Sequence, residues 1–166
     1  MKRLFSPWRS QYIATFKNES VSKRCLFCAM VKKRTDEKNF IVARRKHCFV
    51  VMNLYPYNSG HLMVVPYAHT AGLAKLNAET SAEILKTISD MTEALTRVAS
   101  PQGFNIGANL GRAAGAGIDQ HVHFHVVPRW NGDTNFLPVL ADVKMISEEM
   151  RATYKKLLVY LKQRRM

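Results

Sequence analysis

Cysteines, acidic side chains and long apolar runs are all scarce in this chain of 166 residues. Three cysteines, an odd number, do not make the paired framework of a disulfide-rich secreted protein. No apolar run approaches the ~20 residues that a membrane-spanning helix needs. Lys2 and Arg3 are not followed by the apolar segment of a signal peptide. We therefore expect one domain, 1–166, of ordinary core size, in the cytoplasm and not in a membrane.

Acidic residues number only 12 against 25 Lys and Arg, which gives a net charge of +13. The excess lies at the ends of the chain. Residues 1–46 hold 13 basic and three acidic residues, and residues 143–166 hold seven basic and two acidic residues. The middle, 47–142, holds five basic and seven acidic residues. Charge of this kind is usually solvated surface, and otherwise a patch for nucleic acid or another polyanion. A nucleic-acid-binding protein that uses its basic termini is therefore one hypothesis for the function.

Three of the six histidines alternate with apolar residues in the run His121-Val122-His123-Phe124-His125-Val126-Val127. In a β-strand, side chains at alternate positions share one face, so this run predicts three imidazoles on one side of a strand. Imidazole acts near neutral pH as a nucleophile, a general acid or base, and a metal ligand. Alternate positions lie about 6.6 Å apart, too far for all three to close on one ion. The pattern therefore favours chemistry over a metal held by the three histidines alone.

A glycine-rich stretch, 109–117, comes just before the histidines and reads Asn-Leu-Gly-Arg-Ala-Ala-Gly-Ala-Gly. Such a loop brings bare backbone N–H groups close to a phosphate, although a plain flexible turn has the same composition. Arg112 lies within it, and arginine suits phosphate recognition. Near the N-terminus, Cys25 and Cys28 form a CxxC pair. By itself the pair fits half of a zinc site, a redox pair or two buried thiols.

These features resemble the histidine triad (HIT) superfamily, whose signature of alternating His and apolar residues this chain matches without departure. The resemblance extends over 44–136, through the stretch 53–66 that looks like the first nucleotide-binding strand pair. Within the superfamily, the run NLGRAAGAG…QHVHFHVVPRWNGDTNF is closest to the diadenosine tetraphosphate phosphorylase/hydrolase branch, the fragile histidine triad-like branch. The resemblance implies a HIT domain with core 40–136, preceded by the basic segment with the CxxC pair. It also implies a homodimer with a continuous sheet.

The resemblance also implies a mechanism and a set of site residues. His123 would attack the α-phosphorus of a nucleotide and form a nucleotidyl-histidine, which water or inorganic phosphate would resolve. His125 would contact a phosphate oxygen or assist proton transfer, His121 would orient its neighbour or serve a metal, and His61 would buttress the triad. The predicted substrate-binding residues are Asn53 (ribose), Asn109 (phosphate), Arg112, Gly115 and Gly117. Zinc-bearing relatives take their ligands from positions that correspond here to Cys25, Cys28, His69 and His121, which predicts a structural Cys₂His₂ zinc site.

The implied enzyme is a HIT-type nucleotide hydrolase or phosphorylase that cleaves dinucleoside polyphosphates such as diadenosine tetraphosphate. Four residues before the first triad histidine, relatives carry a phosphate-contacting Gln or Ser, and this chain has Gly117. Only a backbone N–H is available there. This departure leaves open whether water or phosphate is the acceptor, and it keeps nucleoside phosphoramidate hydrolysis as an alternative.

Hydrophobic periodicity predicts an α+β protein with a five-stranded antiparallel sheet, one long helix between strands and a C-terminal helix. Thr80-Ser81-Ala82-Glu83 reads as a capping box at the start of the long helix, and Pro101-Gln102-Gly103 ends it. Apolar residues at helical spacing predict the C-terminal amphipathic helix over 144–162. Cys48 falls in an apolar run and is predicted to be a core thiol. Strands are expected at 40–43, 48–53, 61–65, 104–108 and across the triad.

Overall fold

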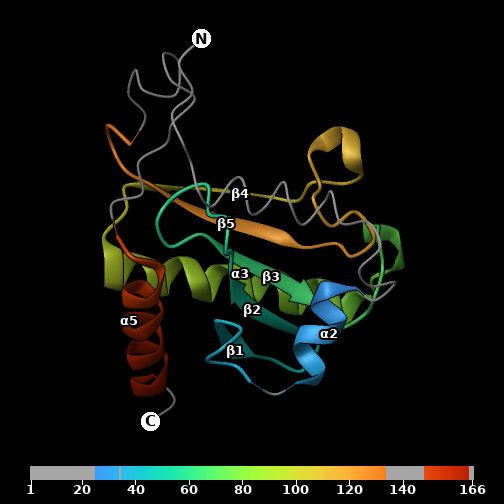
Figure 1. Cartoon of the computed structure of the whole chain (residues 1–166), viewed down its shortest axis with the longest axis horizontal. Helices are drawn as coiled ribbons and strands as arrows, with labels where there is room; N and C mark the ends of the chain where they lie inside the picture. The colour runs from blue at the N-terminus through green and yellow to red at the C-terminus, as the bar shows by residue number, and fades with distance from the viewer. Residues whose placement is uncertain (1–24, 34, 134–147, 165–166) are drawn as a thin grey trace.

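The computed structural model of this chain describes residues 25–33, 35–133 and 148–164. Its regular elements are helices and strands, with three strands in succession after the first helix (Figure 1). In chain order they are α2 (Leu26–Lys32), β1 (Ile41–Arg44), β2 (Cys48–Met52), β3 (Leu62–Pro66), η1 (Leu73–Lys75), α3 (Ala78–Ala99), β4 (Gly103–Gly107), η2 (Arg112–Ala114), β5 (Phe124–Arg129) and α5 (Met150–Gln163). No helix in the described part of the chain has the length and apolar character to cross a membrane.

The strands form one five-stranded antiparallel sheet in the order β1-β2-β3-β5-β4. This confirms the predicted fold class. Strands β3 and β5 lie in the middle, with Met63 opposite His125. Strand β4 pairs with β5 on one side, and its other side is an edge of the sheet where Ile106 is 51% exposed. The centre of the sheet therefore holds the end of the histidine run.

Each face of the sheet is covered by different helices. Figure 1 shows α3 running along the sheet, with α5 at one end and α2 at the other. The α3 face packs the larger core cluster, which includes Val50, Leu62, Val126, Met91 and Leu157. The opposite face packs a smaller cluster built from Phe27, Ile41, Phe49, Val51 and Val65. Because side chains alternate along a strand, His125 lies on the α2 face, opposite its neighbour Val126.

The start of α3 corrects one prediction. The helix begins at Ala78, and Asn77 is its N-cap, with a side chain that accepts a hydrogen bond from the Thr80 N–H at 2.8 Å. The capping box at Thr80–Glu83 is therefore wrong. Glu83 accepts instead from the backbone N–H groups of His47 and Cys48, at 2.6 and 3.1 Å. The sequence pattern alone could not show this use of the Glu83 carboxylate, because its partners His47 and Cys48 are distant in the chain.

Two other helices differ from the sequence prediction. The short helix α2 was not predicted, and it carries the CxxC pair at its start. Helix α5 begins at Met150, where the prediction placed the start at 144, because its N-cap Glu149 has extended backbone angles. Residues 144–147 lie outside the described residues, as do 134–136 of the predicted core and the basic segment up to 24. Cys48 is fully buried, as predicted for a core thiol.

Candidate functional site

Four buried histidines meet on the α2 face of the sheet. His61, His121, His123 and His125 are 1%, 1%, 5% and 8% exposed. The ring centroids of His61 and His125 lie 5.1 Å apart, and those of His123 and His125 lie 4.9 Å apart. Strand β5 begins only at Phe124, so the prediction that the whole triad lies in a strand is wrong for His121 and His123. The structure nevertheless brings His61 beside the triad, where the resemblance placed it.

Two hydrogen bonds join the segment before β5 to the end of β3 and to the loop that follows it. The Val122 N–H donates to the Thr70 carbonyl at 2.6 Å, and His121 Nε2 lies 2.9 Å from the Pro66 carbonyl oxygen. The Phe27 ring packs against the rings of both His121 and His123, at centroid distances of 5.4 and 5.1 Å. These contacts fix two triad histidines that lie outside the regular ladder of the sheet.

The tautomers of His121 and His123 can be assigned from their partners, because a carbonyl oxygen only accepts hydrogen bonds. His121 Nε2 faces the Pro66 carbonyl, so it carries the hydrogen and leaves a lone pair on Nδ1. His123 Nδ1 lies 2.9 Å from the His121 carbonyl, so it carries the hydrogen and leaves a lone pair on Nε2. The two neighbours therefore present opposite ring nitrogens. Nε2 of His123 is a ready nucleophile that needs no deprotonation.

The tautomers of His61 and His125 follow from a backbone N–H, which only donates. The Tyr57 N–H points at His61 Nδ1 at 3.0 Å, so Nδ1 of His61 is an acceptor and Nε2 carries the hydrogen. His61 Nε2 then donates to His125 Nδ1 at 2.9 Å, which leaves the hydrogen of His125 on Nε2. Among the described residues, His125 Nε2 has no hydrogen-bond partner, although it is buried. A buried donor without a partner points to a ligand group that accepts from it.

Burial keeps the triad neutral. Desolvation lowers the pKa of His121 and of His123 below the usual 6.5. For His125, desolvation and, to a lesser extent, the nearby His123 lower the pKa to about 4. Near neutral pH the imidazoles of His121, His123 and His125 therefore stay uncharged, and the tautomers assigned to these three are the relevant species.

The lowered pKa of His125 predicts a loss of stability in mild acid. The unfolded chain binds a proton at His125 below about pH 6.5, whereas the folded chain resists it until about pH 4. Stability should therefore fall as the pH drops through that window, by about 2 kcal/mol between pH 7 and pH 5 from this residue alone. Urea unfolding at the two pH values measures the change, and His125→Gln should show a smaller difference. An equal difference in wild type and His125→Gln would contradict the assignment.

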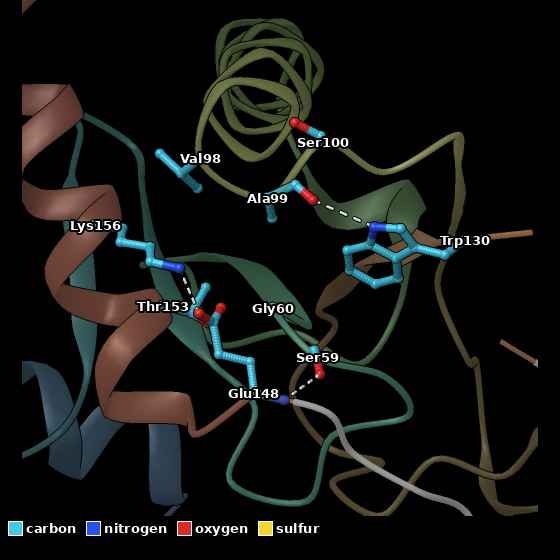
Figure 2. A pocket seen from close by; sticks show the side chains of 9 residues that line it. All are labelled: Ser59, Gly60, Val98, Ala99, Ser100, Trp130, Glu148, Thr153 and Lys156. Atoms are coloured by element: carbon cyan, nitrogen blue, oxygen red, sulfur yellow. Dashed lines mark hydrogen bonds and ion pairs between the residues drawn. The ribbon is translucent and has the colours of Figure 1, made fainter.

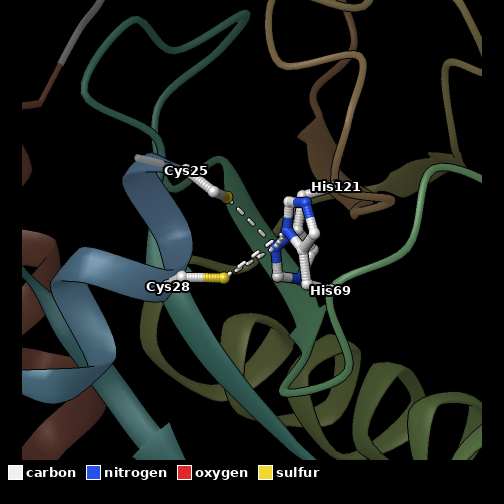
Figure 3. Close-up of side chains that lie close together, drawn as sticks. All are labelled: Cys25, Cys28, His69 and His121. Atoms are coloured by element: carbon white, nitrogen blue, oxygen red, sulfur yellow. Dashed lines mark hydrogen bonds between the residues drawn. The ribbon is translucent and has the colours of Figure 1, made fainter. Parts of the chain in front are cut away.

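A second cluster joins three distant segments at one point. Cys25 and Cys28 from the start of α2, His69 from the loop after β3, and His121 all offer ligand atoms within 4.8 Å of one another (Figure 3). His121 Nδ1 lies 3.2 Å from Cys25 Sγ, 3.7 Å from Cys28 Sγ and 3.3 Å from His69 Nδ1. This is the nitrogen that the Pro66 carbonyl leaves with a lone pair. The four residues named from the sequence therefore form a cluster that could hold a metal ion.

The glycine-rich loop before the triad folds into a tight turn. Gly111 and Gly115 have φ values of +81° and +87°, which residues with a β-carbon rarely adopt. Arg112 pairs with Asp119, with its Nε 2.8 Å from a carboxylate oxygen, and its side chain is 80% exposed. The predicted phosphate contacts of this loop, by Asn109, Arg112, Gly115 and Gly117, stay predictions.

Two aromatic residues have roles that the sequence did not assign. Phe27 is 1% exposed, belongs to the core and packs against the rings of His121 and His123. Tyr57 is 48% exposed, and its ring centroid lies 4.6 Å from that of His61 and 5.4 Å from that of His125. Tyr57 therefore contributes both its ring and its backbone N–H to the site. Its position four residues before His61 is the only sequence signal for this role.

A cavity of about 360 Å³ contains none of the histidines (Figure 2). Its polar groups already pair with one another. Trp130 Nε1 donates to the Ala99 carbonyl, and Glu148 accepts from Thr153 and Lys156. The convergence of four imidazoles marks the functional site more strongly than this cavity does, since chemistry needs reactive groups that remain available. The residues that line the cavity are Ser59, Gly60, Val98, Ala99, Ser100, Trp130, Glu148, Thr153 and Lys156.

Four buried histidines gathered on one face of a five-stranded antiparallel sheet define a histidine triad protein. The HIT domain family matches residues 34–132, and the chain belongs to that family. It is 40% identical over 162 residues to a Mycobacterium tuberculosis protein named AP-4-A phosphorylase, covering 95% of this chain and 83% of that one. It is also 33% identical over 107 residues to adenosine 5'-monophosphoramidase of Schizosaccharomyces pombe, covering 64% and 75%.

A solved structure supports the same placement. A zinc-bound histidine triad family protein from Mycobacterium smegmatis superimposes with a TM-score of 0.69 at 26% identity, covering 85% of this chain and 95% of that one. The fold, the family and the branch near AP-4-A phosphorylase that the sequence predicted are thus confirmed. The chain is a HIT-family nucleotide-processing enzyme.

Proposed function

We propose that this protein transfers a nucleotidyl group from a dinucleoside polyphosphate, such as diadenosine tetraphosphate, to inorganic phosphate through His123. The observation that carries the proposal is the hydrogen bond from His123 Nδ1 to the His121 carbonyl, which leaves the Nε2 lone pair for attack on the α-phosphorus. The relative named AP-4-A phosphorylase, similar over 95% of this chain, supports this substrate and this acceptor. The test must distinguish this reaction from hydrolysis of the same substrate, in which water is the acceptor.

The remaining site residues act on the substrate around His123. Asn53 would contact the ribose, and Asn109 and Arg112 the phosphates. The backbone N–H groups of Gly115 and Gly117 would complete the phosphate cradle, because glycine allows close backbone approach. His125 would meet a phosphoryl oxygen with its unpartnered Nε2–H, and His61 would hold it in place.

We propose zinc as the ion of the Cys₂His₂ cluster. With Zn–N near 2.05 Å and Zn–S near 2.3 Å, a tetrahedral site puts two nitrogens about 3.3 Å apart, and a nitrogen and a sulfur about 3.6 Å apart. The two Nδ1 atoms of His69 and His121 lie 3.3 Å apart, and the nitrogen–sulfur distances are 3.2, 3.5 and 3.7 Å. These distances fit zinc. Zinc would supply structural cohesion there, because all four positions are protein ligands.

We also propose a homodimer formed along the free edge of β4. Within the described residues, that edge has no neighbouring strand, and it carries the half-exposed Ile106. An unpaired edge with an exposed apolar side chain favours pairing with a second copy of the strand. The three free cysteines suit a reducing compartment, so the cytoplasm remains the expected location.

Phosphoramidate hydrolysis is a second candidate, because the relative from Schizosaccharomyces pombe is named a monophosphoramidase. It would use the same attack by His123 with an amine as the leaving group. Nucleic-acid binding through the basic termini remains a hypothesis of another class, and salt-sensitive binding would support it.

The first experiment measures turnover of diadenosine tetraphosphate with and without inorganic phosphate. ADP and ATP formed only with phosphate would support the phosphorylase reaction. AMP and ATP formed regardless of phosphate would show a hydrolase. If the protein turns over adenosine phosphoramidate but not diadenosine tetraphosphate, the second candidate replaces the proposal. If it turns over neither substrate, the proposed nucleotidyl transfer is refuted.

A further inference from the structure

The Tyr57 ring packs against both members of the hydrogen-bonded pair His61 and His125. Its centroid lies 4.6 Å from that of His61 and 5.4 Å from that of His125, with the ring planes tilted by 40° and 33°. Distances of this size are those of aromatic rings in contact. One side chain therefore touches both histidines, whose rings are joined by the 2.9 Å hydrogen bond between His61 Nε2 and His125 Nδ1.

Tyr57 lies between this pair and solvent. The residue is 48% exposed, whereas both histidines are buried. Within the sheet, His125 pairs with Met63 on β3 and with Gly107 on β4, so these two sides of it are closed by neighbouring strands. The outer side of Tyr57 thus meets water while its ring contacts the imidazoles.

The loop that carries Tyr57 is anchored through its backbone and through the next residue. The Tyr57 N–H points at His61 Nδ1 at 3.0 Å. The buried Asn58 donates from its side-chain amide to the Pro128 carbonyl at 3.1 Å and to Asp133 at 2.7 Å. Within the described part of the chain, the Tyr57 hydroxyl has no hydrogen-bond partner. The fold therefore holds the ring in place without using the hydroxyl.

We propose that Tyr57 is a positioning residue whose ring covers the His61–His125 pair, excludes water from it and so keeps His125 aimed at the phosphoryl oxygen of the substrate. The inference rests on the proposed function, in which the Nε2–H of His125 donates to that oxygen. Tyr57 acts through the two histidines and not on the α-phosphorus. This assigns a role to an exposed side chain that lies outside the triad.

Water would weaken the pair by competing for its hydrogen bond. A water molecule can accept from His61 Nε2 and donate to His125 Nδ1, which are the two atoms that now bond to each other. In a site without water, the same bond is stronger because the local dielectric constant is low. With that bond intact, the His125 ring keeps one orientation, and its Nε2–H stays directed at one place.

Water would also favour the charged form of His125. An imidazolium ion needs solvation or a nearby negative charge, and burial withholds the solvation. Desolvation is accordingly the main cause that lowers the pKa of His125 to about 4. None of the groups that face His125 carries a negative charge near neutral pH. They are the rings of His61, His123 and Tyr57, and Met63 and Gly107 on the paired strands.

Protonation would break the pair that Tyr57 covers. A charged His125 carries a hydrogen on Nδ1, which would then face the hydrogen on His61 Nε2. The two donors repel each other, and the ring of His125 loses its fixed orientation. The cover therefore acts on both the protonation and the direction of His125.

Tyr57→Ala removes the cover, and Tyr57→Phe is the matched control because it removes only a hydroxyl that has no described partner. NMR of the His125 ring against pH is the first readout. In wild type and in Tyr57→Phe, the midpoint should stay near the low value of about 4. In Tyr57→Ala it should rise by about one unit or more toward the 6.5 of a solvated imidazole, because access of water stabilises the charged form.

Turnover of diadenosine tetraphosphate is the second readout. In Tyr57→Ala, kcat should fall on the order of tenfold, less than the roughly 10²–10³-fold that removal of a whole oxyanion donor costs, and KM should change little. Tyr57→Leu fills part of the space and should give intermediate values, so it replaces the alanine variant if that variant does not fold. A ring that stacked on a substrate base would instead raise KM and leave the His125 titration unchanged.

Three results would overturn the proposal. These are an unchanged His125 midpoint in both Tyr57→Ala and Tyr57→Leu, a raised midpoint with an unchanged kcat, or a Tyr57→Phe variant that behaves like Tyr57→Ala. If the wild type does not turn over diadenosine tetraphosphate, the proposed function fails instead. The NMR titration then still decides whether Tyr57 covers the pair.

Discussion

His123→Ala is expected to lose turnover of diadenosine tetraphosphate by on the order of 10⁴-fold or more, because it removes the proposed nucleophile. Alanine leaves the backbone of β5 and the other three imidazoles in place. The substrate should therefore still bind, since its proposed contacts come from Asn53, the glycine-rich loop and His125. Steady-state kinetics give the loss of turnover, and equilibrium binding of a non-hydrolysable dinucleotide gives the retained affinity.

The same variant tests the covalent intermediate. Wild type quenched in denaturant during turnover should carry one nucleotidyl group, seen as a mass increase, and His123→Ala should carry none. His47→Asn is the control, because His47 lies at the start of β2, beside Glu79 and away from the triad. Retained turnover in His123→Ala, or a nucleotidyl group on that variant, would show that another group is the nucleophile.

Cys28→Ser is expected to abolish stoichiometric zinc and to lower the melting temperature by roughly 10 °C. A ligand present at 1,000 times its Kd adds about 4 kcal/mol to stability, and 1 kcal/mol moves the melting temperature by about 2–4 °C in a domain of this size. Loss of the ion also frees the start of α2, which the cluster ties to His69 and His121. Metal analysis and a thermal melt measure the two effects.

Cys48→Ala supplies the control for this prediction. Cys48 is fully buried beside Thr87, and burial raises the pKa of its thiol to about 11. Its replacement should cost stability through lost packing while zinc stays at one per chain. Zinc retained in Cys28→Ser, or lost equally in Cys48→Ala, would argue against the Cys₂His₂ site.

His121 links the two sites. Its Nδ1 faces the metal cluster, its Nε2–H holds the Pro66 carbonyl, and its own carbonyl holds His123. Binding of the proposed zinc would therefore affect the orientation of His123, the proposed nucleophile, through His121 alone. Cys28→Ser should reduce turnover as well as stability, although much less than His123→Ala does.

The sequence by itself determined the class of fold and the run of alternating histidines, because these features rest on local periodicity. It gave the CxxC pair as a motif of fixed spacing, whereas His69 and His121 were predicted as metal ligands only through the resemblance to the histidine triad superfamily. The alternation of His and apolar residues placed the imidazoles on one face, and the CxxC pair was visible within four residues. The long helix was also evident, since its apolar residues recur at helical spacing, although its cap at Asn77 was not.

Only the tertiary structure decided which ring nitrogen each histidine presents. The hydrogen bonds that fix the tautomers come from the backbone at Tyr57, Pro66 and His121, and a backbone group carries no sequence signal. Likewise, the use of Glu83 by the N–H groups of His47 and Cys48 depends on two segments that meet only in the fold. The sequence gives the residue types, but the direction of each hydrogen bond depends on where distant backbone donors and acceptors lie.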